Sequence, residues 1–158
     1  MRQLLLGLLV ALFALPVLAE EPVIYVVRHA EKLAGDDPEL SEQGRWRAAR
    51  LADRLADAGI ERIFSTDTKR TRATAAPLAE KLGLEIELYD HRRQHELAAR
   101  LRAGSETVLV VGHSNTIDTF VKALGADPGP PVGDDEYDRL YAVRLAPLAA
   151  ELERYAVE

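Results

Sequence analysis

Four side chains that could bind or attack a phosphate group each follow a short apolar segment of the sequence. They are Arg28, His29, Arg70 and His113. Arginine suits phosphate because its planar fork donates two parallel hydrogen bonds and keeps its charge. Neighbouring cations hold a histidine towards its neutral form, which leaves one ring nitrogen free to attack phosphorus. Brought together, these groups would bind an anion and stabilise a phosphoryl group during its transfer to histidine.

The segments that carry these side chains alternate between predicted strands and predicted helices. Short apolar or β-branched runs predict strands at 23–27, 62–65, 85–89 and 107–112. Helices are expected at 41–58, 68–82, 91–103 and 114–124, and two closing strands at 140–145 and 151–157. Trp46, Leu51 and Leu55 are expected on one side of the first helix. This order is typical of an α/β three-layer sandwich with a mostly parallel sheet, helices on both faces and an antiparallel edge.

The predicted sheet would bring the four side chains to one edge, because ligands of open parallel sheets bind beyond the carboxyl ends of the strands. The cluster KRTR around Arg70 could be a solvated patch. It lies near a helix N-terminus, however, where the helix dipole disfavours cations unless an anion lies between them. His113 could be a core histidine, but a glycine before it and a helix start after it favour an anion cradle. The pattern therefore predicts a pocket for a phosphate-like ligand.

The first residues have the composition of a signal peptide. A short basic start precedes an apolar run, and the small residue Ala19 stands where cleavage would need it. The run is short for a membrane span, so an uncleaved anchor is the alternative. We expect a signal peptide at 1–19 and a single domain at 20–158. Export to a bacterial periplasm follows from this, with no membrane contact after cleavage.

The charge of the chain limits its partners. The formal net charge is −6 at pH 7, and removal of residues 1–19, which hold one arginine and no acid, takes it to −7. An acidic protein of this kind is a poor partner for nucleic acid. A local cluster of basic side chains on such an acidic chain therefore indicates a binding site for an anionic ligand.

Four motifs resemble the motif series of the histidine phosphatase superfamily, also called phosphoglycerate mutase-like. They are VVRHAEK, LSEQG, STDTKRTRATA and VVGHSNT, in the order of that family and across nearly the whole chain after residue 19. The resemblance implies an α/β fold without metal or cofactor, His29 as the nucleophile, and Arg28, Arg70 and His113 as the rest of the phosphate pocket. It implies hydrolysis of a phosphomonoester, or of another phosphoryl compound, through a phosphohistidine on His29.

Many members of that family also supply a carboxylate that protonates the leaving oxygen, from the segment after the third strand. Asp90 is the candidate at that place in this chain, and a helix N-cap is its alternative role. Glu31 and Asp36 on the first loop are rivals for the same role.

Other interpretations stay open. His91 and His95 are spaced i, i+4 and could bind a metal, although a solvated helix is the simpler reading. The segment GPPVGDDEYDRLY could dock a partner, and the chain could be a non-catalytic phosphate-binding module of the same fold. The chain lacks room for the inserted loops with which larger mutases of that family retain their intermediate, which favours hydrolysis. Export favours a phosphorylated small molecule or an envelope component as the substrate; the sequence does not indicate an oligomeric state.

Overall fold

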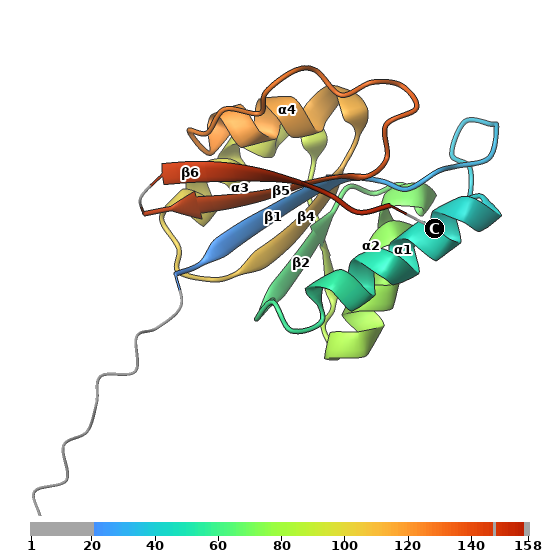
Figure 1. The fold of residues 1–158 in the computed structure, drawn as a ribbon, viewed down its shortest axis with the longest axis horizontal. Coiled ribbons are helices and arrows are strands. Elements are labelled where there is room, and N and C mark those ends of the chain that lie inside the picture. Colours follow the sequence, from blue (N-terminus) through green and yellow to red (C-terminus); the bar gives the residue numbers. More distant parts are fainter. Residues whose placement is uncertain (1–20, 147, 157–158) are drawn as a thin grey trace, which may run out of the picture.

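The computed structural model describes residues 21–146 and 148–156, which place a mixed sheet between two layers of helices (Figure 1). The strands are β1 (Val23–Arg28), β2 (Arg62–Ser65), β3 (Ile86–Leu88), β4 (Val108–Gly112), β5 (Arg139–Leu145) and β6 (Leu148–Arg154). The helices are α1 (Glu42–Leu55), α2 (Lys69–Leu82), α3 (Gln94–Arg102) and α4 (Ser114–Ala123), with a 3₁₀ turn, η1 (His91–Arg93), before α3. The predicted leader at 1–19 lies outside the described residues.

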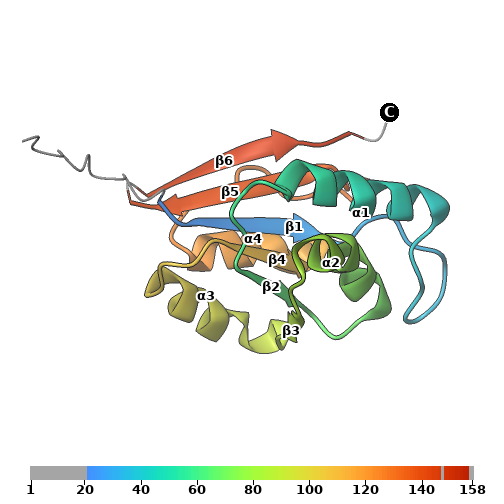
Figure 2. The ribbon, with the colours of Figure 1, turned by 90° about the horizontal axis from the view of Figure 1, so that it is seen from below.

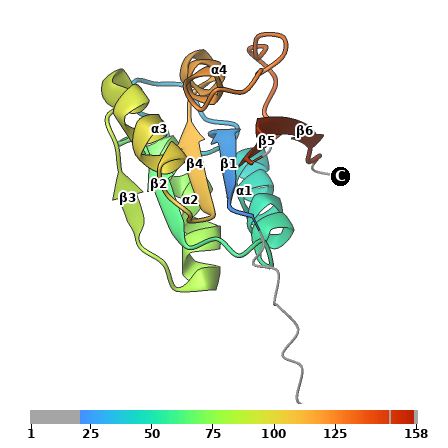
Figure 3. The same cartoon turned by 90° about the vertical axis from the view of Figure 1, so that its left-hand side faces the viewer.

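The strands follow the order β3-β2-β4-β1-β5-β6, which Figure 3 shows across the sheet. The first four pair in parallel, whereas β5 is antiparallel to β1 and β6 is antiparallel to β5. The predicted α/β sandwich, with its mostly parallel sheet and antiparallel edge, is therefore confirmed.

The central strand β4 shows why the sheet is covered on both faces. Val108 and Val110 pack in the core shared with α3 and α4, while Leu109 and Val111 pack in the core shared with α1 and α2. Helices α1 and α2 lie side by side on their face of the sheet (Figure 2). A parallel strand buried on both faces needs an unbroken apolar sequence, which is what makes this strand easy to recognise.

Helix α1 begins at a serine cap and lies very close to the loop after β1. The Ser41 hydroxyl accepts a hydrogen bond from the Gly44 amide, and a Cβ at Gly44 would lie 2.0 Å from the backbone oxygen of Glu31. Leu51 and Leu55 share the buried side of the helix, in agreement with the prediction that they lie on one side, but Trp46 is 62% exposed. The prediction for Trp46 was wrong because five residues of helix turn the side chain about 140° away from Leu51.

The carboxyl ends of β1, β2 and β4 meet at one edge of the sheet. The register pairs Arg28 with Gly112, and the His29 amide donates a 2.9 Å hydrogen bond to the Gly112 carbonyl. Helix α2 starts after its cap Thr68, and α4 starts directly after His113. Within the described part of the chain, no helix has both the length and the apolar character needed to cross a membrane.

Candidate active site

A pocket of about 340 Å³ opens at this edge of the sheet, and we call it the His29 pocket. Its lining residues are Arg28, His29, Lys32, Thr68, Arg70, His91, His113, Ser114 and Asn115. The four side chains predicted to bind phosphate thus come together from three separate segments. Among the described residues no carboxylate lines this pocket, so its wall is cationic or neutral throughout.

His29 is held as a neutral imidazole with one free nitrogen. The residue is only 3% exposed, and its Nδ1 lies 2.8 Å from the Ala30 carbonyl oxygen. A carbonyl can only accept, so Nδ1 carries the proton and Nε2 keeps its lone pair. Burial lowers the pKa of His29 to about 3; the Ala30 carbonyl opposes this shift, and the charges of Arg28 and Arg70 add to it. The ring is therefore ready to act as a nucleophile at neutral pH.

His113 is held by a threonine on one side and an arginine on the other. Its Nε2 lies 2.9 Å from the Thr66 hydroxyl, which itself donates to the Thr71 hydroxyl, so Nε2–H is the donor. Its Nδ1 lies 3.4 Å from Nη2 of Arg70. Burial, with Arg70 as the next cause, lowers the pKa of His113 to about 4. The rings of His29 and His113 are 5.5 Å apart, centroid to centroid.

Arg28 is fixed by the loop between α4 and β5. Its Nη1 donates to the carbonyl oxygens of Gly133, Asp134 and Glu136 at 2.7 to 3.0 Å, and its guanidinium lies 4.0 Å from the centre of the Tyr137 ring. Arg28 is 6% exposed. Three carbonyls on one nitrogen fix the orientation of the guanidinium and leave its other donors for a ligand.

The loop that holds Arg28 is itself anchored. Arg139, 3% exposed, binds the Glu136 carboxylate through Nε and Nη2 and donates to the Pro130 carbonyl at 2.6 Å. The Tyr141 hydroxyl bonds to Asp118 and to the Pro128 carbonyl. The segment GPPVGDDEYDRLY, considered above as a docking surface, thus supplies the support for Arg28.

Arg70 enters the pocket from the first turn of α2. Its backbone carbonyl accepts from the Thr74 hydroxyl, which also accepts from the Ala30 amide, so α2 is tied to the end of β1. Its Nη1 lies 3.5 Å from Asp37. In the described part of the chain the Nε atoms of Arg28 and Arg70 are buried without a hydrogen-bond partner. Buried donors are normally satisfied, and an oxyanion in the pocket would supply acceptors.

None of the three candidate carboxylates lies in the pocket wall. Asp90 caps η1, where its Oδ1 accepts from the Arg92 amide at 2.9 Å. Glu31 is bound bidentately by Arg47 at 2.6 to 2.9 Å. Asp36 lies on the exposed loop after β1 and does not line the pocket. The structure therefore gives Asp90 the role of a cap and places it outside the His29 pocket.

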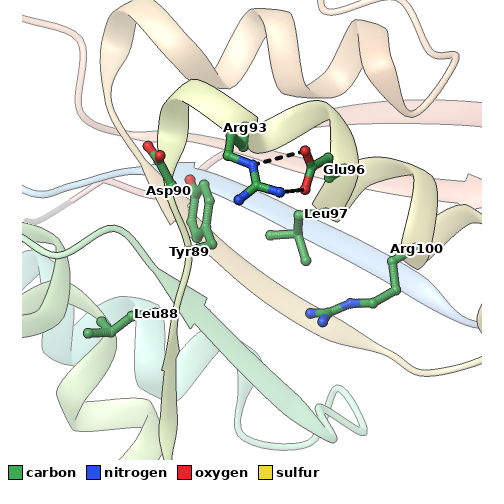
Figure 4. A pocket seen from close by; sticks show the side chains of 7 residues that line it. All are labelled: Leu88, Tyr89, Asp90, Arg93, Glu96, Leu97 and Arg100. Atoms are coloured by element: carbon green, nitrogen blue, oxygen red, sulfur yellow. Dashed lines mark hydrogen bonds and ion pairs between the residues drawn. The ribbon is translucent and has the colours of Figure 1, made fainter.

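A second pocket, of about 390 Å³, lies beside α3, and we call it the α3 pocket (Figure 4). Its lining residues are Leu88, Tyr89, Asp90, Arg93, Glu96, Leu97 and Arg100. Arg93 and Glu96 form a bidentate pair at 2.9 and 2.6 Å, which Figure 4 shows at the top of the pocket. The charge inside this pocket is thus largely balanced by its own residues.

Sequence reasoning missed several residues of the His29 pocket and its support. Thr66 directly follows β2, so the rule that selected His29 and His113 could have selected it as well. His91 was considered only with His95 as a metal pair, and no group of three or more potential metal ligands occurs among residues 21–146 and 148–156. Tyr137 carries no local signal, since its role depends on Arg28 more than 100 positions earlier.

The fold and the site together define an α/β protein with an anion pocket built around a neutral histidine. The model of the histidine phosphatase superfamily (branch 1) matches residues 24–94. The resemblance to the histidine phosphatase superfamily that the four motifs predicted is confirmed over residues 24–94, a little under half of the chain.

Curated relatives match a little under half of the chain. A probable phosphoglycerate mutase GpmB of Erwinia tasmaniensis is 32% identical over 79 residues, which are 45% of this chain and 37% of that protein. The GpmB of Escherichia coli O1:K1 is 35% identical over 77 residues, which are 44% of this chain and 35% of that protein. The match thus spans little more than a third of the length of these relatives.

Solved structures match over most of the chain. A mycobacterial glucosyl-3-phosphoglycerate phosphatase has a TM-score of 0.67 at 17% identity, with 88% of this chain and 100% of that chain covered. The protein histidine phosphatase SixA complexed with tungstate has a TM-score of 0.63 at 18% identity, with 83% and 94% covered. At these identities the likeness establishes the shared fold.

Proposed function

We propose that this protein is a metal-independent phosphatase that transfers a phosphoryl group to Nε2 of His29 and then to water. The observation that carries the proposal is the state of His29. Its Nδ1 proton is committed to the Ala30 carbonyl, and its pKa of about 3 keeps the ring neutral. A deprotonated Nε2 beside two arginines is the arrangement that nucleophilic attack on phosphorus requires.

In the first step the phosphoryl oxygens lie among the donors of Arg28, Arg70 and His113. The Nε2 lone pair of His29 forms the N–P bond while the bond from phosphorus to the leaving oxygen breaks. The arginines stabilise the charge spread over the transferring group. In the second step water attacks phosphorus, the N–P bond breaks, and inorganic phosphate leaves.

We propose hydrolysis in preference to mutase chemistry and to phosphate binding alone. The phosphatases among the structural neighbours support hydrolysis, whereas the curated relatives carry a mutase name. A non-catalytic module would bind phosphate in the same pocket without forming a covalent intermediate.

The test is hydrolysis of p-nitrophenyl phosphate by the wild type and by His29→Ala, each with and without EDTA. We expect activity that survives EDTA and is lost in the variant. Rapid quenching should trap an acid-labile, base-stable phosphoenzyme on His29. Activity retained by His29→Ala would contradict the mechanism, and phosphate binding by an inactive wild type would favour the binding module.

We further propose that the protein acts outside the cytoplasm, on a phosphorylated small molecule or envelope component. The composition of residues 1–19 supports this. N-terminal sequencing of protein recovered from a periplasmic extract of a bacterial host should give a start near Glu20. Recovery of the uncut chain in the cytoplasm would contradict it.

A further inference from the structure

The His29 pocket contains a third histidine that the mechanism above does not use. His91, the first residue of η1, lines the pocket together with His29 and His113. Its ring centroid is 6.0 Å from that of His113. His91 therefore stands beside the phosphoryl site on a different element from the nucleophile.

The chemistry of the pocket requires a proton donor when the leaving group is an alkoxide. The described lining residues include no carboxylate, and Arg28 and Arg70 do not release protons under ordinary conditions. His113 is held neutral, with Nε2–H directed to Thr66 and Nδ1 facing Arg70. His91 and Lys32 are the remaining lining side chains with a cationic acid form. Imidazole suits proton transfer near neutral pH, whereas a lysine ammonium holds its proton more tightly.

Acids in the hollow next to the pocket are engaged elsewhere. That hollow shares Thr68 and His91 with the His29 pocket and contains Asp67 and Asp90. Asp67 is paired with Arg72, and Asp90 accepts the Arg92 amide as the cap of η1. Of the side chains that line both spaces, His91 is thus the one that can act as an acid through a cationic form.

The position of His91 also fits in-line displacement. The leaving oxygen must be on the side of phosphorus opposite to the attacking nitrogen, so its proton donor must stand away from the nucleophile. His29 and His91 each lie next to the His113 ring, with centroids 5.5 and 6.0 Å from it, and His91 is carried by η1, a different element from the one that carries the nucleophile.

We propose that His91 is the general acid that protonates the leaving oxygen and, in its neutral form, the base that activates water in the second step; the proposal rests on the phosphatase function proposed above. In the first step the N–P bond to His29 forms, the P–O bond breaks, and the His91 proton moves to the departing oxygen. In the second step His91 takes a proton from the attacking water as the N–P bond breaks. The cycle returns both histidines to their starting states.

The test compares His91→Gln with the matched control His95→Gln, four residues further along and exposed. Wild type and both variants are assayed on p-nitrophenyl phosphate, phenyl phosphate and β-glycerophosphate. A nitrophenolate can leave without being protonated, whereas an alkoxide needs a proton to leave. We therefore expect His91→Gln to lose about 100-fold in kcat/KM on β-glycerophosphate. On p-nitrophenyl phosphate the loss should be less than about threefold. His95→Gln should behave as the wild type on all three.

Several results would overturn the assignment. Equal losses by His91→Gln on all three substrates would show that His91 only binds the anion, and no loss would show that it is not used. A loss confined to β-glycerophosphate in Lys32→Gln, instead of His91→Gln, would identify Lys32 as the acid. In each of these cases the wild type still hydrolyses p-nitrophenyl phosphate through His29, so the phosphatase function stands; an inactive wild type would remove both proposals.

Discussion

The His29 pocket and the α3 pocket are similar in size, at about 340 and 390 Å³, and differ in how their charges are balanced. In the α3 pocket the guanidinium of Arg93 is paired in a bidentate manner with Glu96 (Figure 4). In the His29 pocket no described lining residue is a carboxylate, and two buried arginine nitrogens have no partner in the described chain. The volume of a pocket therefore says little about its function here, whereas donors that lack acceptors point to a ligand.

The two pockets also differ in which protonation states they favour. Arg93 and Glu96 stabilise each other's charge, because their mutual hydrogen bonds raise the pKa of Arg93 and lower that of Glu96. Burial and nearby cations do the opposite in the His29 pocket, where they suppress the charged form of His29 and His113. An anionic ligand would favour the charged form of these histidines again. Ligand binding and protonation are therefore coupled in the His29 pocket and not in the α3 pocket.

The largest difference should come from removing one arginine from each pocket. Arg70→Met removes a donor to the transferring phosphoryl group and should lower kcat/KM for p-nitrophenyl phosphate at least about 100-fold. Arg93→Met in the α3 pocket should change it less than about twofold. Steady-state kinetics give kcat/KM for both variants. Similar losses of kcat/KM in both would show that the two pockets are not functionally distinct.

A smaller effect is expected from giving the His29 pocket the carboxylate that it lacks. Asn115→Asp changes little in shape and adds a negative charge to the wall. Repulsion should weaken inhibition by vanadate at least about tenfold, or ~1.4 kcal/mol. Glu96→Gln, which removes a carboxylate from the α3 pocket, should leave the inhibition constant unchanged. Unaltered vanadate binding by Asn115→Asp would mean that the anion binds elsewhere.

The support of Arg28 should matter less than the arginines themselves. Tyr137→Leu removes the ring that lies 4.0 Å from the guanidinium and leaves the three carbonyl contacts in place. We expect kcat/KM to fall by roughly five- to tenfold, consistent with a partly desolvated cation–π contact. Tyr137→Phe keeps the ring and should stay near the wild type. A loss as large in the Phe variant as in the Leu variant would assign the effect to the hydroxyl.

The smallest effect concerns stability against acid. An unfolded histidine binds a proton near pH 6.5, whereas folded His29 resists it down to about pH 3, so the free energy of unfolding should fall as the pH drops through this window. The expected slope is on the order of 1 kcal/mol per pH unit. Glu96, with its lowered pKa, contributes stability that is lost only as the pH falls below its ordinary value of 4.5.

Urea unfolding between pH 6.5 and pH 5 therefore measures how the His29 pocket contributes to the pH dependence of the free energy of unfolding. His29→Asn should show a shallower pH dependence than the wild type, and vanadate should reduce the slope of the wild type. A slope unaffected by His29→Asn would show that its ring is not held neutral in the folded protein.

The sequence was most informative where a side chain directly follows a strand. Arg28, His29 and His113 were placed correctly because the end of a buried strand fixes the residues just beyond it. Trp46 was wrongly placed on the same side of α1 as Leu51 and Leu55, because the five residues from Trp46 to Leu51 turn the helix by about 140°. Asp90 was proposed from its place in the chain, whereas its short side chain is engaged by the Arg92 amide. Tyr137 could not be found, since a contact across a separation of more than 100 residues leaves no periodic or local pattern.

The carbonyl groups that fix Arg28 lie in a part of the chain that is synthesised after all the site motifs. These three carbonyl groups come 105 to 108 positions later in the chain than the arginine they fix. A nascent chain that ends after α4 already contains the three histidines and both arginines of the pocket, yet it lacks the carbonyl groups that fix Arg28. The full set of Arg28 contacts therefore requires the loop before β5 in addition to the motifs, and changes of length in that loop should alter the rate while every motif stays intact.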